Sequence, residues 1–293
     1  MTQPTPPRRA AVLGHPIAHS LSPVLHRTAY EVLGLPWQYD AVDVDVDALP
    51  DFMAGLGSEW AGLSLTMPLK EAVLPLLDTV DPLAHQLRSV NTVVFTDEDE
   101  DGRPGRAGYN TDVHGIVETI RGHLLIDQAS SSASRALIIG GGATARSAVA
   151  ALAQLQVETV IVCARRSQIA GAVAALATDL GSVGETAAWP PSQRTLAEPL
   201  VVSTIPAAAG GAFAGDLPLT PGALLDVLYD PWPTPLAAAW MAGGGVAVGG
   251  LDLLVHQATE QVRLMTGQVV EPSILRAAGL AALSRRNIAQ AEQ

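Results

Sequence analysis

Short apolar runs alternate with amphipathic stretches along the first third of the chain. The strand-like runs occupy residues 10–13, 37–43, 61–65 and 91–95, and the stretches with helical spacing occupy 23–33, 47–55 and 68–77. This alternation predicts a largely parallel sheet covered by helices. The acidic, glycine-rich segment TDEDEDGRPGR then interrupts the pattern, and it is typical of a solvated turn between two strands.

The rest of the chain restarts the same alternation after a polar interruption. A helix is expected after GYNTD, with Ile116, Val117, Ile120 and Leu124 at helical spacing. The tract DQASSSASR, residues 127–135, is then expected to form a surface loop.

From residue 136 the strand candidates are ALII, TVIVC, PLVVST, ALLDVLY and GVAVGG, with helical stretches between them. Such a cycle is typical of a doubly wound nucleotide-binding domain. Beyond Gly250 the pattern is helical to the end of the chain, and these helices are expected to fold back on the first unit.

Composition and charge exclude several classes of protein. The 293 residues are 48% hydrophobic, enough for a full core, but no apolar run approaches the roughly 18 residues of a membrane span. The N-terminal residues lack the apolar stretch of a signal peptide, so a cytoplasmic protein is expected. The net charge of −12 argues against a nucleic-acid partner.

The cysteine and histidine content argues against metal and disulfide chemistry. The single cysteine, Cys163, excludes an internal disulfide and a cysteine-based zinc cage, and its apolar surroundings predict a buried strand residue. The seven histidines show no metal-ligand spacing, so no metal is expected.

The segment GHPIAHSLSP carries two serines ahead of a predicted helix. Pro23 suits the first helical position and Ser22 the N-cap before it. Two hydroxyls, Ser20 and Ser22, beside unpaired N–H groups would also form a small site for a carboxylate. Taken alone, the segment favours a plain cap.

A glycine-rich turn links a predicted strand to a predicted helix at residues 140–145. Gly140 permits the tight turn, Gly142 lets a pyrophosphate approach the backbone, and Ala145 takes the third position of the G-x-G-x-x-G/A pattern. Because the turn lies between a strand and a helix, a dinucleotide site is favoured over a structural turn.

The end of the following strand indicates which dinucleotide is bound. An NAD site usually places an acid there for the ribose hydroxyl, whereas this chain has Arg165 and Arg166. Guanidinium groups bind phosphate well, so NADP(H) is predicted; the alternative is an exposed basic pair without a ligand.

Lys70 and Asp112 each fall near a predicted helix start. The segment GLSLTMPLKEAV places Pro68 first in a helix and Lys70 in its first turn, where the helix dipole disfavours a positive charge. Lys70 is therefore either a surface residue at a slightly unfavourable position or a functional amine. Asp112 is either an acidic residue that stabilises a helix start or the partner of Lys70. If the two side chains meet, they have the ingredients of a proton-transfer pair.

Several spaced motifs, in order, resemble one family nearly end to end. They are GHPIAHSLSP, TMPLK, SVNT, YNTD, the glycine turn with Arg146, STIP, YDPWPTPL and GGLDLLVHQ. The chain thereby resembles the shikimate 5-dehydrogenases, NADP-dependent enzymes of aromatic amino-acid biosynthesis. The resemblance implies an α/β protein with a substrate domain over 1–112, a Rossmann-like domain over 113–249 and C-terminal helices over 250–293 that pack on the first.

The resemblance also implies roles for individual residues. Lys70 and Asp112 would be the catalytic pair, and Ser20, Ser22 and Tyr229 would bind the substrate carboxylate. The ring hydroxyls would be bound by Thr66, Asn91, Asp112 and Gln257. The cofactor would be held by Gly140, Gly142, Ala143, Arg146, Arg165, Arg166, Thr204, Gly250 and Leu253.

Plainer interpretations remain open for four of these residues. Asn91 would then cap a turn, and Thr66 would cap the helix at Pro68. Tyr229 would be a core residue, and Gln257 would be a surface residue beside an apolar stripe.

The chain departs from the family pattern at a few positions. The family often has asparagine at Ser64 and Arg27, Asn-Arg-Thr at 164–166, glycine at Ala143 and methionine at Leu253. The implied reaction is reversible reduction of 3-dehydroshikimate to shikimate by a monomer or homodimer. The alternatives are an NAD-dependent quinate/shikimate dehydrogenase and a catalytically silent ligand-sensing homologue.

Overall fold

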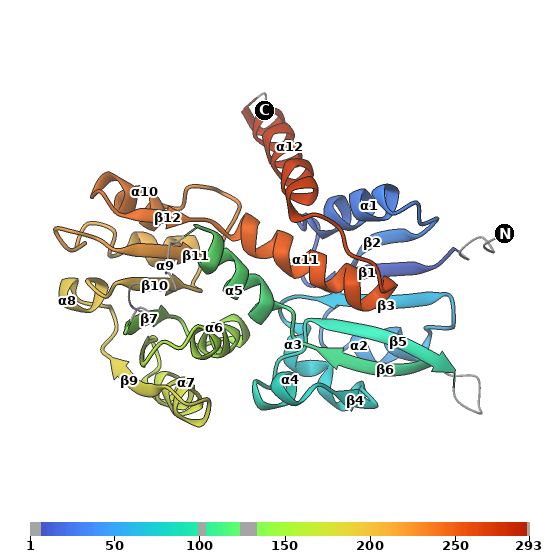
Figure 1. The fold of residues 1–293 in the computed structure, drawn as a ribbon, viewed down its shortest axis with the longest axis horizontal. Helices are drawn as coiled ribbons and strands as arrows, with labels where there is room; N and C mark the ends of the chain where they lie inside the picture. Colours follow the sequence, from blue (N-terminus) through green and yellow to red (C-terminus); the bar gives the residue numbers. More distant parts are fainter. Residues whose placement is uncertain (1–6, 99–103, 124–133, 292–293) are drawn as a thin grey trace. The chain divides into compact units, whose positions relative to one another are not determined.

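The computed structural model describes residues 7–98, 104–123 and 134–291, and these residues form two sheets with their covering helices (Figure 1). Contacts between Cα atoms divide them into two compact units. The first runs as far as Thr111 and resumes at Val255, and the second runs from Asp112 to Leu254. Each unit contains one sheet.

The first unit is built on a mixed sheet. Its strands are β1 (Arg9–Gly14), β2 (Gln38–Asp43), β3 (Trp60–Leu65), β4 (Thr79–Val80), β5 (Thr92–Glu98) and β6 (Pro104–Tyr109). Its helical segments are α1 (Ser22–Val32), α2 (Leu49–Ala54), α3 (Leu69–Ala72), η1 (Leu74–Leu76), α4 (Pro82–Gln86) and α12 (Pro272–Ala291). Helix α11 (Gly250–Thr266) begins among residues of the second unit and continues in the first.

The strand order in this sheet is β2-β1-β3-β5-β6-β4. Strand β1 is parallel to β2 and β3, but β5 is antiparallel to both of its neighbours, β3 and β6. The prediction of a largely parallel sheet is therefore wrong at β5. The connections explain this direction. After β3 the chain forms β4 at the outer edge of the sheet and then α4, and β5 begins beside the end of β3. Strand β6 follows β5 closely in the sequence and is antiparallel to it.

Two predicted helix boundaries in the first unit are also wrong. Helix α1 starts at Ser22 itself and its N-cap is Leu21. The Ser22 N–H donates to the Ser20 hydroxyl at 3.2 Å. The predicted helix over 68–77 is divided into α3 and η1, with Pro68 as the N-cap rather than the first helical residue. The break at Val73 lies two residues before Pro75, which has no N–H to donate within a continuing α-helix.

The second unit is an entirely parallel sheet in the order β12-β11-β10-β7-β8-β9. Its strands are β7 (Arg135–Ile139), β8 (Thr159–Cys163), β9 (Val183–Ala187), β10 (Leu200–Ser203), β11 (Ala223–Asp226) and β12 (Val246–Val248). Its helices are α5 (Asp112–His123), α6 (Ala143–Gln154), α7 (Ser167–Asp179), α8 (Gln193–Leu196), α9 (Ala207–Gly211) and α10 (Pro235–Ala242). This is the predicted doubly wound arrangement, so the α/β fold class is confirmed.

The hydrophobic core of the second unit lies on its central strands. Leu137, Ile139, Val201 and Leu224 from these strands pack with Trp240 of α10, and all five are buried. Cys163 is buried at the end of β8, as predicted, and its thiol donates to the Ala188 carbonyl at 3.1 Å. Burial raises the pKa of this thiol to about 11, so it stays protonated at neutral pH.

The C-terminal helices return to the first unit, as predicted. Helix α12 packs against α1 (Figure 1), and Gln261 of α11 is hydrogen-bonded to residues of β3 and β5. None of the described helices combines the length and the apolar character needed to cross a membrane. The predictions for Leu124, for most of the loop 127–135 and for the middle of the turn 96–106 lie outside the described residues.

Candidate active site

Gly140 follows β7 at the point where the parallel sheet changes its winding direction. Its φ of +128° lies in the region that favours glycine, and a Cβ there would overlap the side chain of Thr204. The Gly140 N–H donates to the Cys163 carbonyl at 2.9 Å, which ties the turn to the end of β8. Thr204, which follows β10, donates to the Ile139 carbonyl at the end of β7 from both its N–H (2.8 Å) and its hydroxyl (3.0 Å). These hydrogen bonds tie the glycine turn to the end of β10.

The turn leads directly into the N-terminus of α6, a helix of 12 residues. Gly142 is the N-cap; no side chain caps the helix there, and the first turn contains no acidic residue. A Cβ on Gly142 would meet nothing within 4 Å, so the backbone is open on that side. Unpaired N–H groups at the positive end of a helix dipole favour an anion such as a phosphate.

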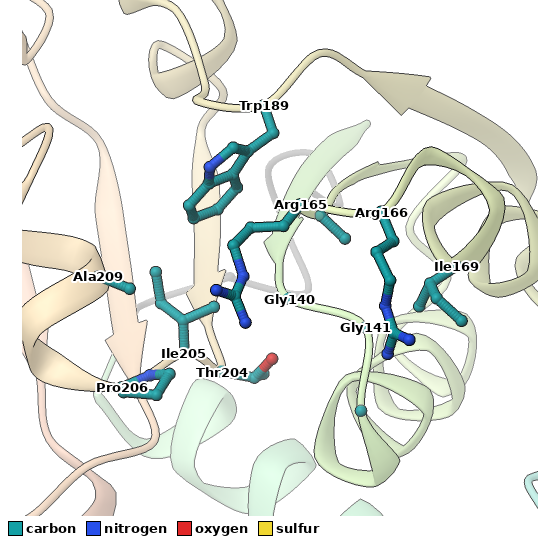
Figure 2. Close-up of a pocket in the computed structure, with 12 residues that line it drawn as sticks. Gly140, Gly141, Arg165, Arg166, Ile169, Trp189, Thr204, Ile205, Pro206 and Ala209 are labelled. Carbon is teal, nitrogen blue, oxygen red and sulfur yellow. The ribbon is translucent and has the colours of Figure 1, made fainter.

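A cavity of about 260 Å³ opens beside this turn (Figure 2). It is formed by the segments that follow β7, β8, β9 and β10, and β7 lies between β8 and β10 in the sheet. The crevice therefore lies at the topological switch point, which is where open parallel sheets bind their ligands. Its lining residues are Gly140, Gly141, Gly142, Ala164, Arg165, Arg166, Ile169, Trp189, Thr204, Ile205, Pro206 and Ala209.

The charge of this cavity comes from two arginines. Arg165 and Arg166 follow β8, and both side chains are exposed at the cavity. In the view of Figure 2, Arg165 extends between Trp189 and Thr204, and Arg166 lies on the side of Ile169 and Gly141. Among the described lining residues none is acidic. The cavity is therefore suited to a ligand that carries phosphate groups.

Trp189 is a wall of this cavity that the sequence pattern did not indicate. Its ring packs edge-on against Phe213, with ring centroids 5.8 Å apart. It lies just after β9, a strand in which no residue is fully buried and which therefore produced no strand signal. Recognition of β9 would have placed Trp189 at the same edge as the two arginines.

Other predicted cofactor residues lie outside the lining of this cavity. Ala143 and Arg146 are in the first turn of α6, Gly250 starts α11, and Leu253 is buried in the first turn of α11. Gly250 donates to the Leu228 carbonyl at 2.9 Å, and a Cβ there would collide with the backbone of Val227. Gly250 therefore packs against the segment that carries Tyr229, which is half-buried.

The predicted substrate residues of the first unit gather at one edge of the mixed sheet. Ser20 and Ser22 follow β1, Thr66 and Lys70 follow β3, and Asn91 directly precedes β5. Because β5 runs against β3, its start lies at the same edge as the ends of β1 and β3.

Backbone hydrogen bonds connect the parts of this edge. Leu65 donates to the Asn91 carbonyl at 2.8 Å, and Val90 donates to the Lys70 carbonyl at 2.8 Å. Lys70 is half-buried in the short helix α3, and no side chain caps that helix, so Thr66 is not its cap.

Asn91 is completely buried and its amide is oriented by hydrogen bonds. Its Oδ1 accepts from the Thr111 N–H (2.8 Å), from the Thr111 hydroxyl (3.1 Å) and from the Thr92 hydroxyl (2.9 Å). A backbone N–H can only donate, so the atom that faces it is the amide oxygen. Asp112, which is buried at the start of α5, is the next residue after Thr111.

The serine-bearing loop between β1 and α1 is held from two directions. Asp43, at the end of β2, accepts from His15 Nδ1 at 2.6 Å and from the Ile17 N–H at 3.3 Å. The hydrogen bond to Asp43 raises the pKa of His15. From the other direction, Arg286 of α12 donates to the carbonyl oxygens of His19 and Ser20.

No cluster of three histidine, cysteine, aspartate or glutamate side chains within the described ranges is arranged to hold a metal ion.

Comparison with known proteins agrees with this geometry. Residues 12–93 match the shikimate dehydrogenase substrate binding domain. The shikimate dehydrogenase (NADP(+)) of Methylobacterium radiotolerans is 38% identical over 257 residues, which are 85% of this chain and 88% of that protein. The chain belongs to the shikimate dehydrogenase family.

Solved structures of shikimate dehydrogenases share the fold described here. The Mycobacterium tuberculosis enzyme has a TM-score of 0.84 and 38% identity, covering 94% of this chain and 100% of that one. A Thermus thermophilus shikimate 5-dehydrogenase in complex with NADP(H) and shikimate has a TM-score of 0.75 and 32% identity, covering 94% and 99%.

Proposed function

We propose that this chain catalyses the reversible, NADPH-dependent reduction of 3-dehydroshikimate to shikimate. Membership of the shikimate dehydrogenase family supports the reaction. The observation that carries the cofactor assignment is the cavity at the switch point, where Arg165 and Arg166 accompany an open glycine turn. Two guanidinium groups without an accompanying acid fit a ribose 2′-phosphate better than a 2′-hydroxyl.

The residues around the cavity divide the binding of NADP between them. The open backbone at Gly142 and the N-terminus of α6 would receive the pyrophosphate, and Arg165 and Arg166 would receive the adenosine phosphate. Ala143, Arg146 and Thr204 would support this half of the cofactor, and Gly250 and Leu253 would lie near the nicotinamide. When bound, NADPH supplies the hydride for the reaction.

The residues of the first unit would hold the substrate. Ser20 and Ser22 would bind its carboxylate together with Tyr229. Asn91, Thr66 and Gln257 would bind the ring hydroxyls, and the buried orientation of the Asn91 amide suits a donor role because its oxygen is already engaged. This assignment places residues 1–112 and 250–293 in a substrate domain and residues 113–249 in a cofactor domain.

Lys70 and Asp112 would perform the proton transfer. As the carbonyl carbon is reduced, its oxygen becomes alkoxide-like, and the Lys70 ammonium would donate a proton to it. In the reverse direction the neutral amine would take that proton back. Asp112 would orient the amine and stabilise its charged form. General acid catalysis of this kind contributes about 10²–10⁴-fold to a rate.

The test is the initial rate of oxidation of shikimate and of quinate, each with NADP and with NAD. The expected result is the highest kcat/KM with shikimate and NADP. A higher kcat/KM with quinate and NAD would establish the quinate/shikimate dehydrogenase instead. The absence of turnover with all four pairs, while either ligand still binds, would identify a silent ligand-sensing protein. The predicted monomer or homodimer is checked separately by sedimentation.

A further inference from the structure

Gln261 of α11 is completely buried, and both ends of its amide are hydrogen-bonded. Its Oε1 accepts from the Ser64 hydroxyl at 2.9 Å, and its Nε2 donates to the Thr92 hydroxyl at 3.0 Å and to the Asn91 carbonyl at 3.3 Å. Ser64 and Thr92 are register partners on the antiparallel strands β3 and β5. One side chain from the C-terminal part of the chain therefore bridges a cross-strand pair at the predicted substrate edge.

Gly62 allows α11 to approach the sheet closely enough for this bridge. Met265 lies one helical turn after Gln261, and a Cβ on Gly62 would come within 2.8 Å of its Cγ and Cε atoms. The same Cβ would lie 2.7 Å from the Val93 carbonyl oxygen. A larger residue at position 62 would displace the helix and lengthen the hydrogen bonds of Gln261.

On one side the bridge reaches Asn91. The Thr92 hydroxyl that accepts from Gln261 also donates to Asn91 Oδ1 at 2.9 Å, and Thr111 lies 3.1 Å from both of these oxygens. With Oδ1 directed at Thr92 and Thr111, the Nδ2 group of Asn91 must be directed away from them. The bridge thus supports the orientation in which Asn91 presents a donor to a ring hydroxyl.

On the other side the bridge reaches Ser22. The Tyr39 hydroxyl donates to Ser64 at 2.6 Å, so the hydrogen bonds of the bridge extend to Tyr39. His26 stacks on Tyr39 with ring centroids 4.0 Å apart, and its Nδ1–H donates to the Ser22 carbonyl at 2.9 Å. Buried hydrogen bonds therefore join Asn91 to Tyr39 through Gln261, and the stacked rings of Tyr39 and His26 continue the connection to Ser22.

We propose that Gln261 is a positioning residue that presets Ser22 and Asn91 for opposite ends of one small ring acid. The proposal rests on the proposed function, which assigns the carboxylate to Ser22 and a ring hydroxyl to Asn91. Buried polar networks specify one arrangement when every member is satisfied, and they lose it when one member is missing. Loss of the Gln261 amide would leave Ser64 and Thr92 without a shared partner and would remove the donor that directs the Thr92 hydroxyl toward Asn91 Oδ1.

The side chain at position 64 provides a second test of the bridge. Serine has no amide group that could donate a hydrogen bond to Thr92. Gln261 of α11 supplies that amide. We therefore expect Ser64→Asn to substitute for the missing amide when Gln261 is replaced.

The experiment measures steady-state kinetics and thermal unfolding of Gln261→Met, which keeps length and apolar volume without hydrogen bonds. The KM for shikimate should rise about tenfold, which corresponds to about 1.4 kcal/mol, while the KM for NADP stays unchanged. Gln268→Met, at an exposed position just beyond α11, is the matched control. The Ser64→Asn/Gln261→Met double variant should regain much of the lost affinity. If Gln261→Met does not fold, Gln261→Glu, which keeps the shape of the side chain and replaces the amide donor with a carboxyl group, is measured instead.

Asn91→Ala separates the two possible failures. If it raises the KM for shikimate while Gln261→Met lowers only the unfolding temperature, Gln261 is merely structural and the positioning role is overturned. If Asn91→Ala itself leaves the KM unchanged, the assignment of Asn91 in the proposed function is wrong, and the positioning role fails with it.

Discussion

Arg286, near the C-terminal end of α12, donates a hydrogen bond from Nη1 to the carbonyl oxygen of His19 at 2.8 Å. Its Nη2 donates to the Ser20 carbonyl at 3.3 Å, so one guanidinium holds two successive carbonyls of the serine loop. The loop lies between β1 and α1, and its other anchor is Asp43. A residue that touches neither substrate nor cofactor in our assignment therefore fixes the loop that carries Ser20 and leads into Ser22.

Replacement of this anchor should weaken substrate binding selectively. We expect Arg286→Ala to raise the KM for shikimate several-fold, because hydrogen bonds from a charged group contribute about 1.5–3 kcal/mol and part of that holds the loop. The KM for NADP should not change. Arg285→Ala, at an exposed position on the same helix, is the control. Equal KM values for the two variants would show that the loop keeps its conformation without Arg286.

Lys70→Ala tests the proposed proton donor. We expect kcat to fall by about 10²–10⁴-fold, the contribution typical of general acid catalysis, with a much smaller change in KM. Steady-state rates in both directions measure this, because the same group serves as acid and base. An unchanged kcat would remove Lys70 from the mechanism.

The two arginines at the cavity should determine the choice between NADP and NAD. Arg165→Ala and Arg166→Ala should each raise the KM for NADP by about 10–100-fold, as expected for loss of one charge-assisted hydrogen bond. The KM for NAD, which has no 2′-phosphate, should change little. Kinetics with both cofactors measure the ratio. An equal rise in the KM for NADP and the KM for NAD would show instead that the arginines support the cavity without recognising the 2′-phosphate.

His26 should make stability depend on pH in a defined window. Burial lowers the pKa of His26 from 6.5 to about 4, against the smaller raising effects of the Ser22 carbonyl and Gln261. Between these two pH values the unfolded chain binds a proton that the folded chain does not, so the free energy of unfolding falls as pH falls. The loss should approach about 3 kcal/mol at pH 4, and above pH 6.5 this contribution is complete.

Urea unfolding at several pH values between 7 and 4.5 checks this expectation. In His26→Phe, which keeps a ring beside Tyr39, this component of the pH dependence should be absent. The same slope in both proteins would show that other groups account for the acid sensitivity.

The sequence pattern predicts strands that contain an apolar run or an apolar–polar alternation, and it misses strands that contain neither. β8, TVIVC, is buried at four of its five positions and was recognised, whereas β9, VGETA, is buried at none and was missed. The direction of β5 could not be predicted either, because an apolar run has the same pattern in both directions. The N-cap was placed at Ser22 because a local rule favours serine there, but the hydroxyl that engages the helix start belongs to Ser20.

The candidate site shows the same division between local and distant information. The glycine turn and the arginines after β8 were predicted from local motifs, and the cavity contains both. Gln261 and Arg286 carried no local signal, because their partners lie 169 or more positions away in the chain. The roles of Lys70, Asp112 and the substrate-binding residues come from resemblance and stay predictions.

The register of β5 against β3 has a further consequence. Each residue along a strand faces the side opposite to its neighbour, so sliding β5 by one position would turn Thr92 away from Ser64 and Gln261. We expect that deleting a single residue from 87–90 would disconnect Ser22 from Asn91 while leaving every proposed catalytic group in the chain. The length of this connection, and not only its composition, should then influence substrate recognition.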